Sequence, residues 1–221
     1  MEQPALRFAP EVLLRAQGVR AAIFDVDGVL TDGRLYIGEH GETVKAFHSL
    51  DGHGLKLLVA GGIEPIVISG RDSPALRRRM ADLGITRIAL GASDKLAVAA
   101  PLLQALQLDW SEVAAMGDDW PDLPLLHRAR FACAVPDAHI EVRALAHHTT
   151  SARGGRGAAR EFCDLLLCAA LRFEPTSERP DGGSSRVEAP ALHLQQIGIP
   201  PGGARRFSND HRHRATRAAP A

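Results

Sequence analysis

Two carboxylates, Asp25 and Asp27, stand directly after a short apolar run at 21–24. Such a run predicts a buried strand, and the carboxyl end of a strand in a parallel α/β sheet faces the ligand crevice. Gly28 follows, and a glycine lets the backbone approach an anion closely. Two neighbouring acids repel each other unless a divalent metal offsets their charge, or unless one is a nucleophile and the other carries a proton. The alternative is a strand that simply ends in an Asp-Gly turn.

Three more polar groups follow predicted strands farther along the chain. The hydroxyl of Ser69 can donate to a phosphate oxygen, although Ser-Gly is also ordinary turn chemistry. Lys95 begins a predicted helix, where its charge opposes the helix dipole and favours an anionic partner; a solvated lysine is the alternative. Asp118, Asp119 and Asp122 form a carboxylate cluster that suits Mg²⁺, or else the acidic N-terminus of a helix.

The elements that must position these groups alternate along the chain. Apolar runs predict strands at 21–25, 65–69, 87–90, 113–117, 131–135 and, briefly, 147–150. Helical patterns fall at 11–16, 53–60, 73–84, 93–106, 138–145 and 156–171, with a short helix after Pro121. Strands spaced by helices predict an α/β fold, a Rossmann-like doubly wound parallel sheet. Apolar runs at 35–37 and 43–47, joined by a Gly-containing loop, predict a small β-hairpin.

Composition divides the 221-residue chain into two parts. Residues 1–173 carry the alternating pattern and are expected to form one domain. Residues 174–221 are rich in proline, glycine and arginine and contain a single aromatic residue, Phe207. Such a segment buries too little apolar surface to offset the entropy of ordering, so it is predicted to be a disordered tail. An RNA- or lipid-binding patch of its arginines is the alternative.

The remaining composition limits location and partners. Formal net charge is zero, so no nucleic-acid or membrane partner is expected. The three cysteines show no CxxC spacing, which predicts reduced thiols packed as small hydrophobes. The N-terminus lacks the basic and apolar regions of a signal peptide. Together these features predict a cytoplasmic protein.

The order DxDG, Ser, Lys, GDDxxD, with each motif after a strand, resembles the haloacid dehalogenase superfamily of aspartate-nucleophile phosphatases over about residues 20–170. This resemblance implies a Mg²⁺ site at the carboxyl edge of the sheet. It further implies that Asp25 attacks phosphorus and forms an aspartyl-phosphate, while Asp27 protonates the leaving alkoxide and then activates water. Phosphoryl transfer depends mainly on such positioning and charge neutralisation.

The other residues of the motifs receive roles from the same resemblance. Ser69 and Lys95 are expected to hold phosphoryl oxygens. Asp118 is expected to bind the metal together with the Asp25 carboxylate and the Asp27 carbonyl, and Asp119 and Asp122 to support it from behind. The space between Asp27 and Ser69 holds only a hairpin and one helix, so no large cap domain is predicted.

Longer stretches, among them KAFHSLDGHGLKLL, GDDWPDLP and GGRGAAREFCDLLL, resemble the capless family that acts on 3-deoxy-D-manno-octulosonate 8-phosphate. The implied substrate is a small phosphorylated sugar acid, in the pathway to the Kdo sugar of lipopolysaccharide. The resemblance assigns substrate contacts to Asp27, Ser69, Lys95, His48, Ser49, Leu50, Asp51, Gly52, Lys56, Arg71 and Arg79. At positions 50 and 56 some family members carry arginine. A nine-carbon sialic-acid-type sugar phosphate and a non-catalytic binding protein remain alternatives, whereas a mutase would need a cap to shield the phosphorylated enzyme from water.

An isolated two-stranded hairpin is too small to be stable in water, which favours pairing with other subunits. The family resemblance implies a homotetramer in which the stretch Gly154, Gly155, Arg156 and Gly157 reaches a neighbouring active site. Arg156 would then meet a substrate anion in trans. The alternative is a flexible loop that leads into the last helix.

Overall fold

The computed structural model describes residues 8–171, so the predictions for 174–221 lie outside the described residues. Its centre is a six-stranded sheet in the order β5-β4-β1-β6-β7-β8, with every neighbouring pair parallel. The strands are β1 (Ala21–Phe24), β4 (Glu64–Ser69), β5 (Ile88–Leu90), β6 (Val113–Gly117), β7 (Phe131–Ala134) and β8 (His148–Thr149).

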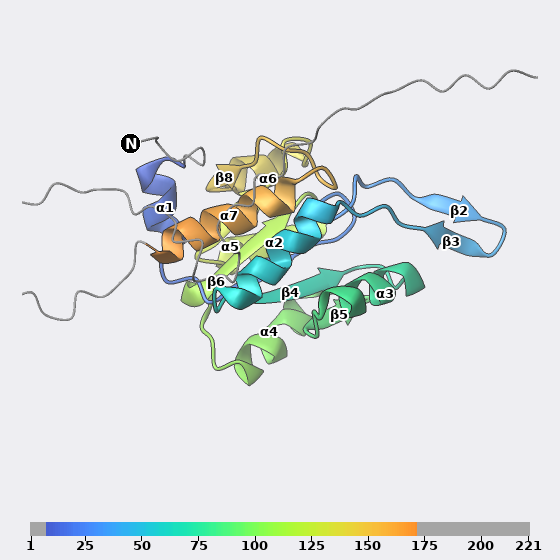
Figure 1. The fold of residues 1–221 in the computed structure, drawn as a ribbon, viewed down its shortest axis with the longest axis horizontal. Coiled ribbons are helices and arrows are strands. Elements are labelled where there is room, and N and C mark those ends of the chain that lie inside the picture. The colour runs from blue at the N-terminus through green and yellow to red at the C-terminus, as the bar shows by residue number, and fades with distance from the viewer. Residues whose placement is uncertain (1–7, 172–221) are drawn as a thin grey trace, which may run out of the picture. The chain divides into compact units, whose positions relative to one another are not determined.

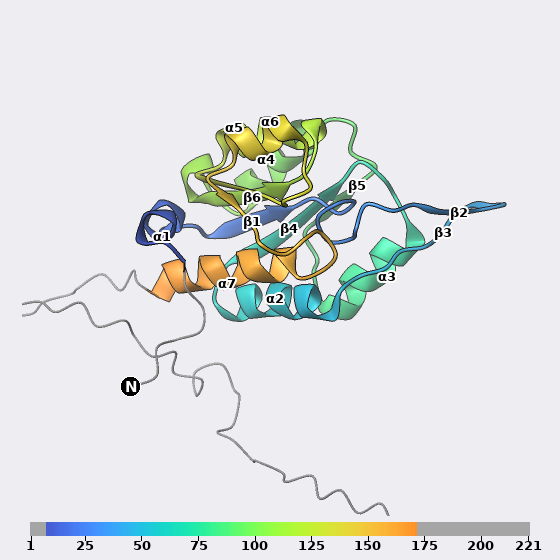
Figure 2. The ribbon, with the colours of Figure 1, turned by 90° about the horizontal axis from the view of Figure 1, so that it is seen from above.

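Helices cover both faces of this sheet. One face carries α4 (Lys95–Ala105), α5 (Leu123–Arg128) and α6 (Ile140–Leu145), and the other carries α2 (Ser49–Ala60), α3 (Pro74–Leu83) and α7 (Ala158–Leu171) (Figure 2). The first helix, α1 (Pro10–Ala16), packs against α7, and two 3₁₀ turns, η1 (Trp110–Glu112) and η2 (Trp120–Asp122), flank β6. The predicted doubly wound parallel sheet is therefore confirmed. No helix in the part of the chain described is long and apolar enough to cross a membrane.

The strand order places the chemistry-bearing segments together. From β1 the chain builds outward through β4 to β5, then returns to the other side of β1 as β6 and continues to β7 and β8. The direction of winding thus reverses around β1. Ligand crevices of open α/β sheets form at such a switch point, outside the carboxyl ends of the strands. The segments after β1, β4 and β6 all end there.

The start of α2 differs from the prediction. The helix begins at Ser49, four residues earlier than the pattern indicated, and the His48 ring nitrogen Nδ1 accepts from the Leu50 amide (3.3 Å) at its N-cap. Glycines at 52 and 54 lower local helix propensity, which is why the pattern began late. Packing overrides that preference, because a Cβ on Gly54 would lie 3.1 Å from Cys163 Sγ of α7.

Between β1 and α2 the chain forms an antiparallel hairpin, β2 (Tyr36–Gly38) and β3 (Gly41–Val44), which we call the flap. It extends away from the sheet as a narrow arm (Figure 1). The two strands pair closer to the turn than expected, leaving only residues 39 and 40 between them. Ile37 and Val44 are exposed. With the flap and α2 alone between β1 and β4, the expected absence of a large cap insertion at this point is confirmed.

Aromatic packing fixes the sheet against α7. The Phe162 ring of α7 meets Phe24 of β1 edge-to-face, with ring centroids 5.5 Å apart, and stacks on Phe131 of β7 at 6.3 Å. All three side chains are fully buried. Such pairs contribute beyond the area they bury. The helix α7 therefore packs against β1, the strand that precedes Asp25 and Asp27.

Candidate active site

A cavity of about 410 Å³ opens at the carboxyl edge of the sheet. It collects groups from the ends of β1, β4 and β6 and from the start of α4. The sequence-predicted residues that line it are Asp25, Asp27, Ser69, Arg71, Lys95, Asp118, Asp119 and Asp122. The four motifs, separated by up to about a hundred residues along the chain, thus converge on one site.

Lys95 lies between two carboxylates inside this cavity. Its Nζ donates to Asp25 Oδ1 at 2.5 Å and to Asp122 Oδ1 at 2.6 Å, and it is only 6% exposed. Burial disfavours the charged amine, but attraction by Asp25 and Asp122 outweighs it and raises the pKa of Lys95. The lysine is therefore a fixed cation at the floor of the site, rather than a solvated surface residue. Asp94 makes this position possible, because its carboxylate caps α4 through the Ala97 amide (3.0 Å).

Asp122 also holds the segment that follows β6. Its Oδ2 accepts from the backbone amides of Asp118 (3.0 Å) and Asp119 (3.3 Å), while its Oδ1 binds Lys95. Asp122 is 3% exposed. Both of its oxygens are thus engaged within the protein. This arrangement supports the predicted role of Asp122 as a residue that positions Asp118.

The chemistry of the acidic cluster fits a hard divalent cation. Carboxylate oxygens of Asp25, Asp118 and Asp122 lie within 4.8 Å of one another. Burial, followed by the neighbouring charge of Asp122, raises the pKa of Asp25 to about 6. Burial and the charge of Asp25 raise the pKa of Asp118 to about 8. A cation would relieve this repulsion, and oxygen ligands of this kind suit Mg²⁺. Because both oxygens of Asp122 are engaged, one by Lys95 and one by two backbone amides, Asp25 and Asp118 are the side chains that fit such an ion.

Gly28 allows the two metal-binding segments to meet. Its φ of +105° lies in the region that favours glycine, and a Cβ there would lie 2.1 Å from Asp118 Oδ2. A side chain at position 28 would therefore displace Asp118. The proposed contribution of the Asp27 carbonyl to the ion stays a prediction.

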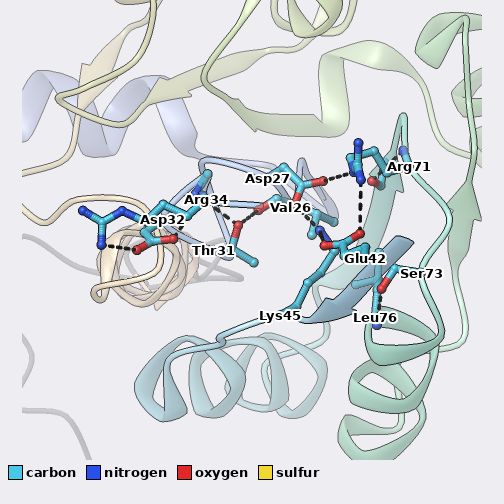
Figure 3. A network of polar contacts seen from close by, with 12 residues as sticks. Val26, Asp27, Thr31, Asp32, Arg34, Glu42, Lys45, Arg71, Ser73 and Leu76 are labelled. Carbon is cyan, nitrogen blue, oxygen red and sulfur yellow. Dashed lines mark hydrogen bonds and ion pairs between the residues drawn. The ribbon is translucent and has the colours of Figure 1, made fainter. Parts of the chain in front are cut away.

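The Asp27 carboxylate belongs to a second network, which it forms with charged residues at the base of the flap and after β4 (Figure 3). It pairs with Lys45 Nζ, and its Oδ2 lies 3.9 Å from Arg71 Nε. Glu42 of β3 bridges the same two cations, 2.7 Å from Lys45 Nζ and 3.4 Å from Arg71 Nη2. The Lys45 side chain is 1% exposed. The base of the flap thus fixes the position of Asp27.

Glu42 and Lys45 were missed by sequence reasoning. Glu42 lies outside the predicted strand 43–47, and alternation along an extended chain would place residues three apart on opposite faces. The observed strand β3 ends at Val44, so the alternation of side chains no longer applies to Lys45. Its side chain lies on the same side as Glu42 and pairs with it. The one available signal is a Lys beside an apolar pair, which is also common on a solvated strand.

Ser69 ends β4 and is 1% exposed. Its Oγ accepts from the Arg71 amide at 3.1 Å. An oxygen that accepts this bond retains its own hydrogen to donate. The geometry supports the predicted contact with a phosphate oxygen.

The residues predicted from the stretch around α2 lie outside the carboxylate cavity. Ser49, Leu50 and Lys56 are exposed on α2. A Cβ on Gly52 would lie 2.2 Å from Arg79 Nη2, so the Arg79 guanidinium lies directly over this glycine. Their substrate contacts stay predictions.

Two other members of this set have partners within the protein. His48 caps α2. Asp51, 2% exposed, accepts from the amides of Gly157 (3.3 Å) and Arg160 (2.8 Å) at the start of α7. The substrate contacts assigned to these residues likewise stay predictions.

Arg156 is exposed beside a separate cavity of about 410 Å³. The cavity is also lined by Asp32, Phe47, His48 and Gly155 of the same chain. A role of Arg156 at a neighbouring subunit stays a prediction.

Comparison with known proteins agrees with this geometry. Residues 82–161 match the model of the haloacid dehalogenase-like hydrolase family. The 3-deoxy-D-manno-octulosonate 8-phosphate phosphatase KdsC of Yersinia pestis is 43% identical over 166 residues, 75% of this chain and 89% of the relative. KdsC of Escherichia coli K12 is 42% identical over 164 residues, 74% of this chain and 87% of the relative. The chain belongs to the 3-deoxy-D-manno-octulosonate 8-phosphate phosphatase family.

A solved structure of the family superposes well. The Moraxella catarrhalis phosphatase, in complex with a magnesium ion, a phosphate ion and a KDO molecule, matches with a TM-score of 0.70 and 38% identity. The match covers 74% of this chain and 94% of that one.

Proposed function

We propose that this chain hydrolyses 3-deoxy-D-manno-octulosonate 8-phosphate to Kdo and inorganic phosphate with Mg²⁺, a step in supplying the sugar acid of lipopolysaccharide. The observation that carries the proposal is the junction at the end of β1. There Asp25 meets a buried lysine and a second carboxylate, while Asp27 faces the cavity from the flap side. The comparisons support the substrate, since the KdsC relatives are 42–43% identical to this chain over 87–89% of their own length.

The residues of the site suit a two-step transfer. The Asp25 carboxylate attacks phosphorus, and the bond from phosphorus to the sugar oxygen breaks as Asp27 donates a proton to that oxygen. Water then attacks the phosphoryl group on Asp25 while Asp27 takes a proton from it, which returns both carboxylates to their starting state. Lys95 and Ser69 stabilise the phosphoryl oxygens. A bound Mg²⁺, held by Asp25 and Asp118, would supply further charge neutralisation.

The experiment that tests this function is a steady-state assay of phosphate release with Mg²⁺ on two substrates. We expect a kcat/KM for 3-deoxy-D-manno-octulosonate 8-phosphate well above that for a nine-carbon sialic-acid-type sugar phosphate. The reverse order would move the assignment to the nine-carbon substrate. Binding of both compounds without phosphate release would instead indicate a non-catalytic binding protein on the same fold.

We further propose a homotetramer, in the cytoplasm, whose subunits pair through their flaps. Tyr36, Ile37 and Val44 expose apolar surface on a hairpin that is too small to be stable alone. Sedimentation should report a mass near four chains. Mixing Asp25→Asn with Arg156→Ala subunits should restore activity above either parent if Arg156 acts in trans. A fully active monomer would overturn this assembly.

A further inference from the structure

Asp51 is a buried carboxylate that the proposed chemistry does not use. It lies in the first turn of α2, yet its oxygens accept from the Gly157 and Arg160 amides at the N-terminus of α7. The first amides of a helix lack partners within it, and negative charge is stabilised there. Asp51 thus ties the start of α7 to the start of α2, two elements more than a hundred residues apart in sequence.

The residues that precede α7 pack directly on the turn that follows Asp27. We call residues 154–157 the glycine loop and residues 28–32 the catalytic turn. The Gly155 amide donates to the Val29 carbonyl at 2.9 Å. A Cβ on Gly154 would lie 1.8 Å from the Gly28 carbonyl oxygen, and one on Gly155 would lie 2.5 Å from the Asp32 amide nitrogen. Backbone meets backbone here with no room for a side chain.

The other side of the catalytic turn faces the acidic cluster. Gly28 lies against the Asp118 carboxylate, as its close approach to Oδ2 requires. Within the turn, the Thr31 amide and hydroxyl both donate to the Val26 carbonyl, at 2.9 and 3.3 Å (Figure 3). The catalytic turn is therefore held between the glycine loop and Asp118. Displacement of the loop would move the backbone that separates Asp27 from Asp118.

We propose that Asp51 is a positioning residue, which clamps the glycine loop onto the catalytic turn and so sets the placement of Asp27 relative to Asp118. The inference rests on the proposed function. It differs from a substrate contact, because both Asp51 oxygens are directed to α7. It also differs from simple capping of α7, which would stabilise the fold without affecting turnover by the folded protein.

Asp51→Asn tests the clamp, because the amide keeps the shape but turns one acceptor into a donor that faces a backbone N–H. We expect kcat to fall roughly 10- to 100-fold, the effect of misplacing reacting groups by about 1 Å, with little change in KM. The matched control is Asp164→Asn on α7. It removes the ion pair with Arg160 Nε (2.8 Å) but leaves the loop untouched, so kcat should stay within about twofold.

A pair of glycine substitutions provides the second test. Gly155 and Gly18 have similar left-handed φ values, +63° and +79°, so Gly155→Ala and Gly18→Ala share the backbone strain. Only Gly155 faces the catalytic turn, since nothing lies within 4 Å of a Cβ at Gly18. We expect Gly155→Ala to lose kcat as Asp51→Asn does, and Gly18→Ala to retain it. This pair keeps the proposal testable if Asp51→Asn does not fold.

Amide hydrogen exchange separates the clamp from the proposed function. In full-length Asp51→Asn and Gly155→Ala proteins, exchange at Thr31 should accelerate at least about tenfold while that at Ile23 of β1 stays unchanged. Unchanged exchange at Thr31, or accelerated exchange with a normal kcat, would overturn the positioning role. If the wild-type chain releases no phosphate, the proposed function fails, and exchange at Thr31 alone then decides whether the clamp exists.

Discussion

Two clusters of opposite charges meet at the active site, and they are built differently. Asp25 follows the central strand β1, Lys95 begins α4 and Asp122 ends η2, and all three are buried. The flap network around Asp27 consists of Glu42, Lys45 and Arg71. It depends instead on a hairpin whose strands are mostly exposed, together with Arg71, which follows β4. Parallel strand register fixes the first cluster. The flap network is fixed only by side-chain contacts between the base of the flap, Asp27 and Arg71.

In the mechanism that we propose, this difference matches the different tasks of the two carboxylates of the DxDG motif. The nucleophile must meet phosphorus in line, and a rigid sheet edge provides that placement. The proton carrier must face both the leaving sugar and the entering water. The cations Lys45 and Arg71 hold the Asp27 carboxylate in reach of both, and Glu42 holds these two cations. Substitutions in the two clusters should therefore affect catalysis by different amounts.

The largest expected effect is at Asp25 and Asp27, the two carboxylates that we propose to be catalytic. Asp25→Asn removes the proposed nucleophile and a proposed metal ligand together, so we expect no turnover. Asp27→Asn should retain Mg²⁺ binding and lose roughly 10²- to 10⁴-fold in kcat, the usual contribution of a general acid and base. Steady-state phosphate release, with mass spectrometry to exclude deamidation, measures both. Near wild-type kcat in intact Asp25→Asn would contradict the mechanism.

The cation of the buried cluster comes next. Lys95→Met leaves Asp25 and Asp122 buried without their shared partner, and breaking a buried pair in this way costs about 3–5 kcal/mol. We expect a much lower midpoint of urea unfolding, together with at least a hundredfold loss of kcat. Lys56→Met on the exposed side of α2 is the matched control and should leave unfolding nearly unchanged. Equal midpoints for the two variants would show that the buried cluster contributes little to stability.

Sequence reasoning predicted the buried cluster much better than the flap network. Asp25 and Asp118 directly follow strands, Ser69 ends one, and Lys95 begins the helix after β5. Parallel strands bring their carboxyl ends to one edge whatever their spacing along the chain. Lys45 reaches Asp27 because β3 ends one residue before it. A boundary of one residue is beyond what propensity can decide.

The contact between the glycine loop and the catalytic turn was hidden for a similar reason. The resemblance placed GGRG at a neighbouring active site, and that role stays a prediction. Within the chain, the glycines fit a narrow gap in which the Gly155 amide donates to the Val29 carbonyl. Nothing in a local pattern specifies which of the distant segments fills the gap, because tertiary packing decides it. The start of α2 at Ser49 also depended on packing, in that case against α7.

Disrupting the flap network should give an intermediate effect. Burial opposes the charge of Glu42, but hydrogen bonding and attraction by Lys45, followed by Arg71, lower its pKa, so it is ionised at neutral pH. Glu42→Gln weakens charge-assisted bonds worth about 1.5 kcal/mol or more. We expect a roughly tenfold fall in kcat/KM without loss of Mg²⁺ binding. Glu39→Gln, at the exposed tip of the flap, should have no effect. A similar loss in both variants would attribute the effect to the flap surface instead of the network.

The smallest effect is the pH dependence of stability, which again separates the two regions. The pKa values of Asp25, about 6, and Asp118, about 8, exceed the ordinary value of 3.8. At a pH above the ordinary pKa but below the raised ones, the folded chain holds protons that the unfolded chain has lost. Stability without metal should therefore fall as pH rises from about 5 to 8. Mg²⁺ displaces those protons, so its stabilising effect should grow over the same range.

Thermal unfolding in EDTA and in Mg²⁺, each at about pH 5 and about pH 8, measures this linkage. We expect the increase in Tm that Mg²⁺ produces to differ by several degrees between the two pH values. Asp118→Asn should remove most of the dependence, because it removes the carboxyl that titrates highest. Glu42→Gln should preserve it, since the pKa of Glu42 is lowered and this carboxyl therefore takes up no proton over that range. Equal stabilisation by Mg²⁺ at both pH values would show that the ion does not bind between Asp25 and Asp118.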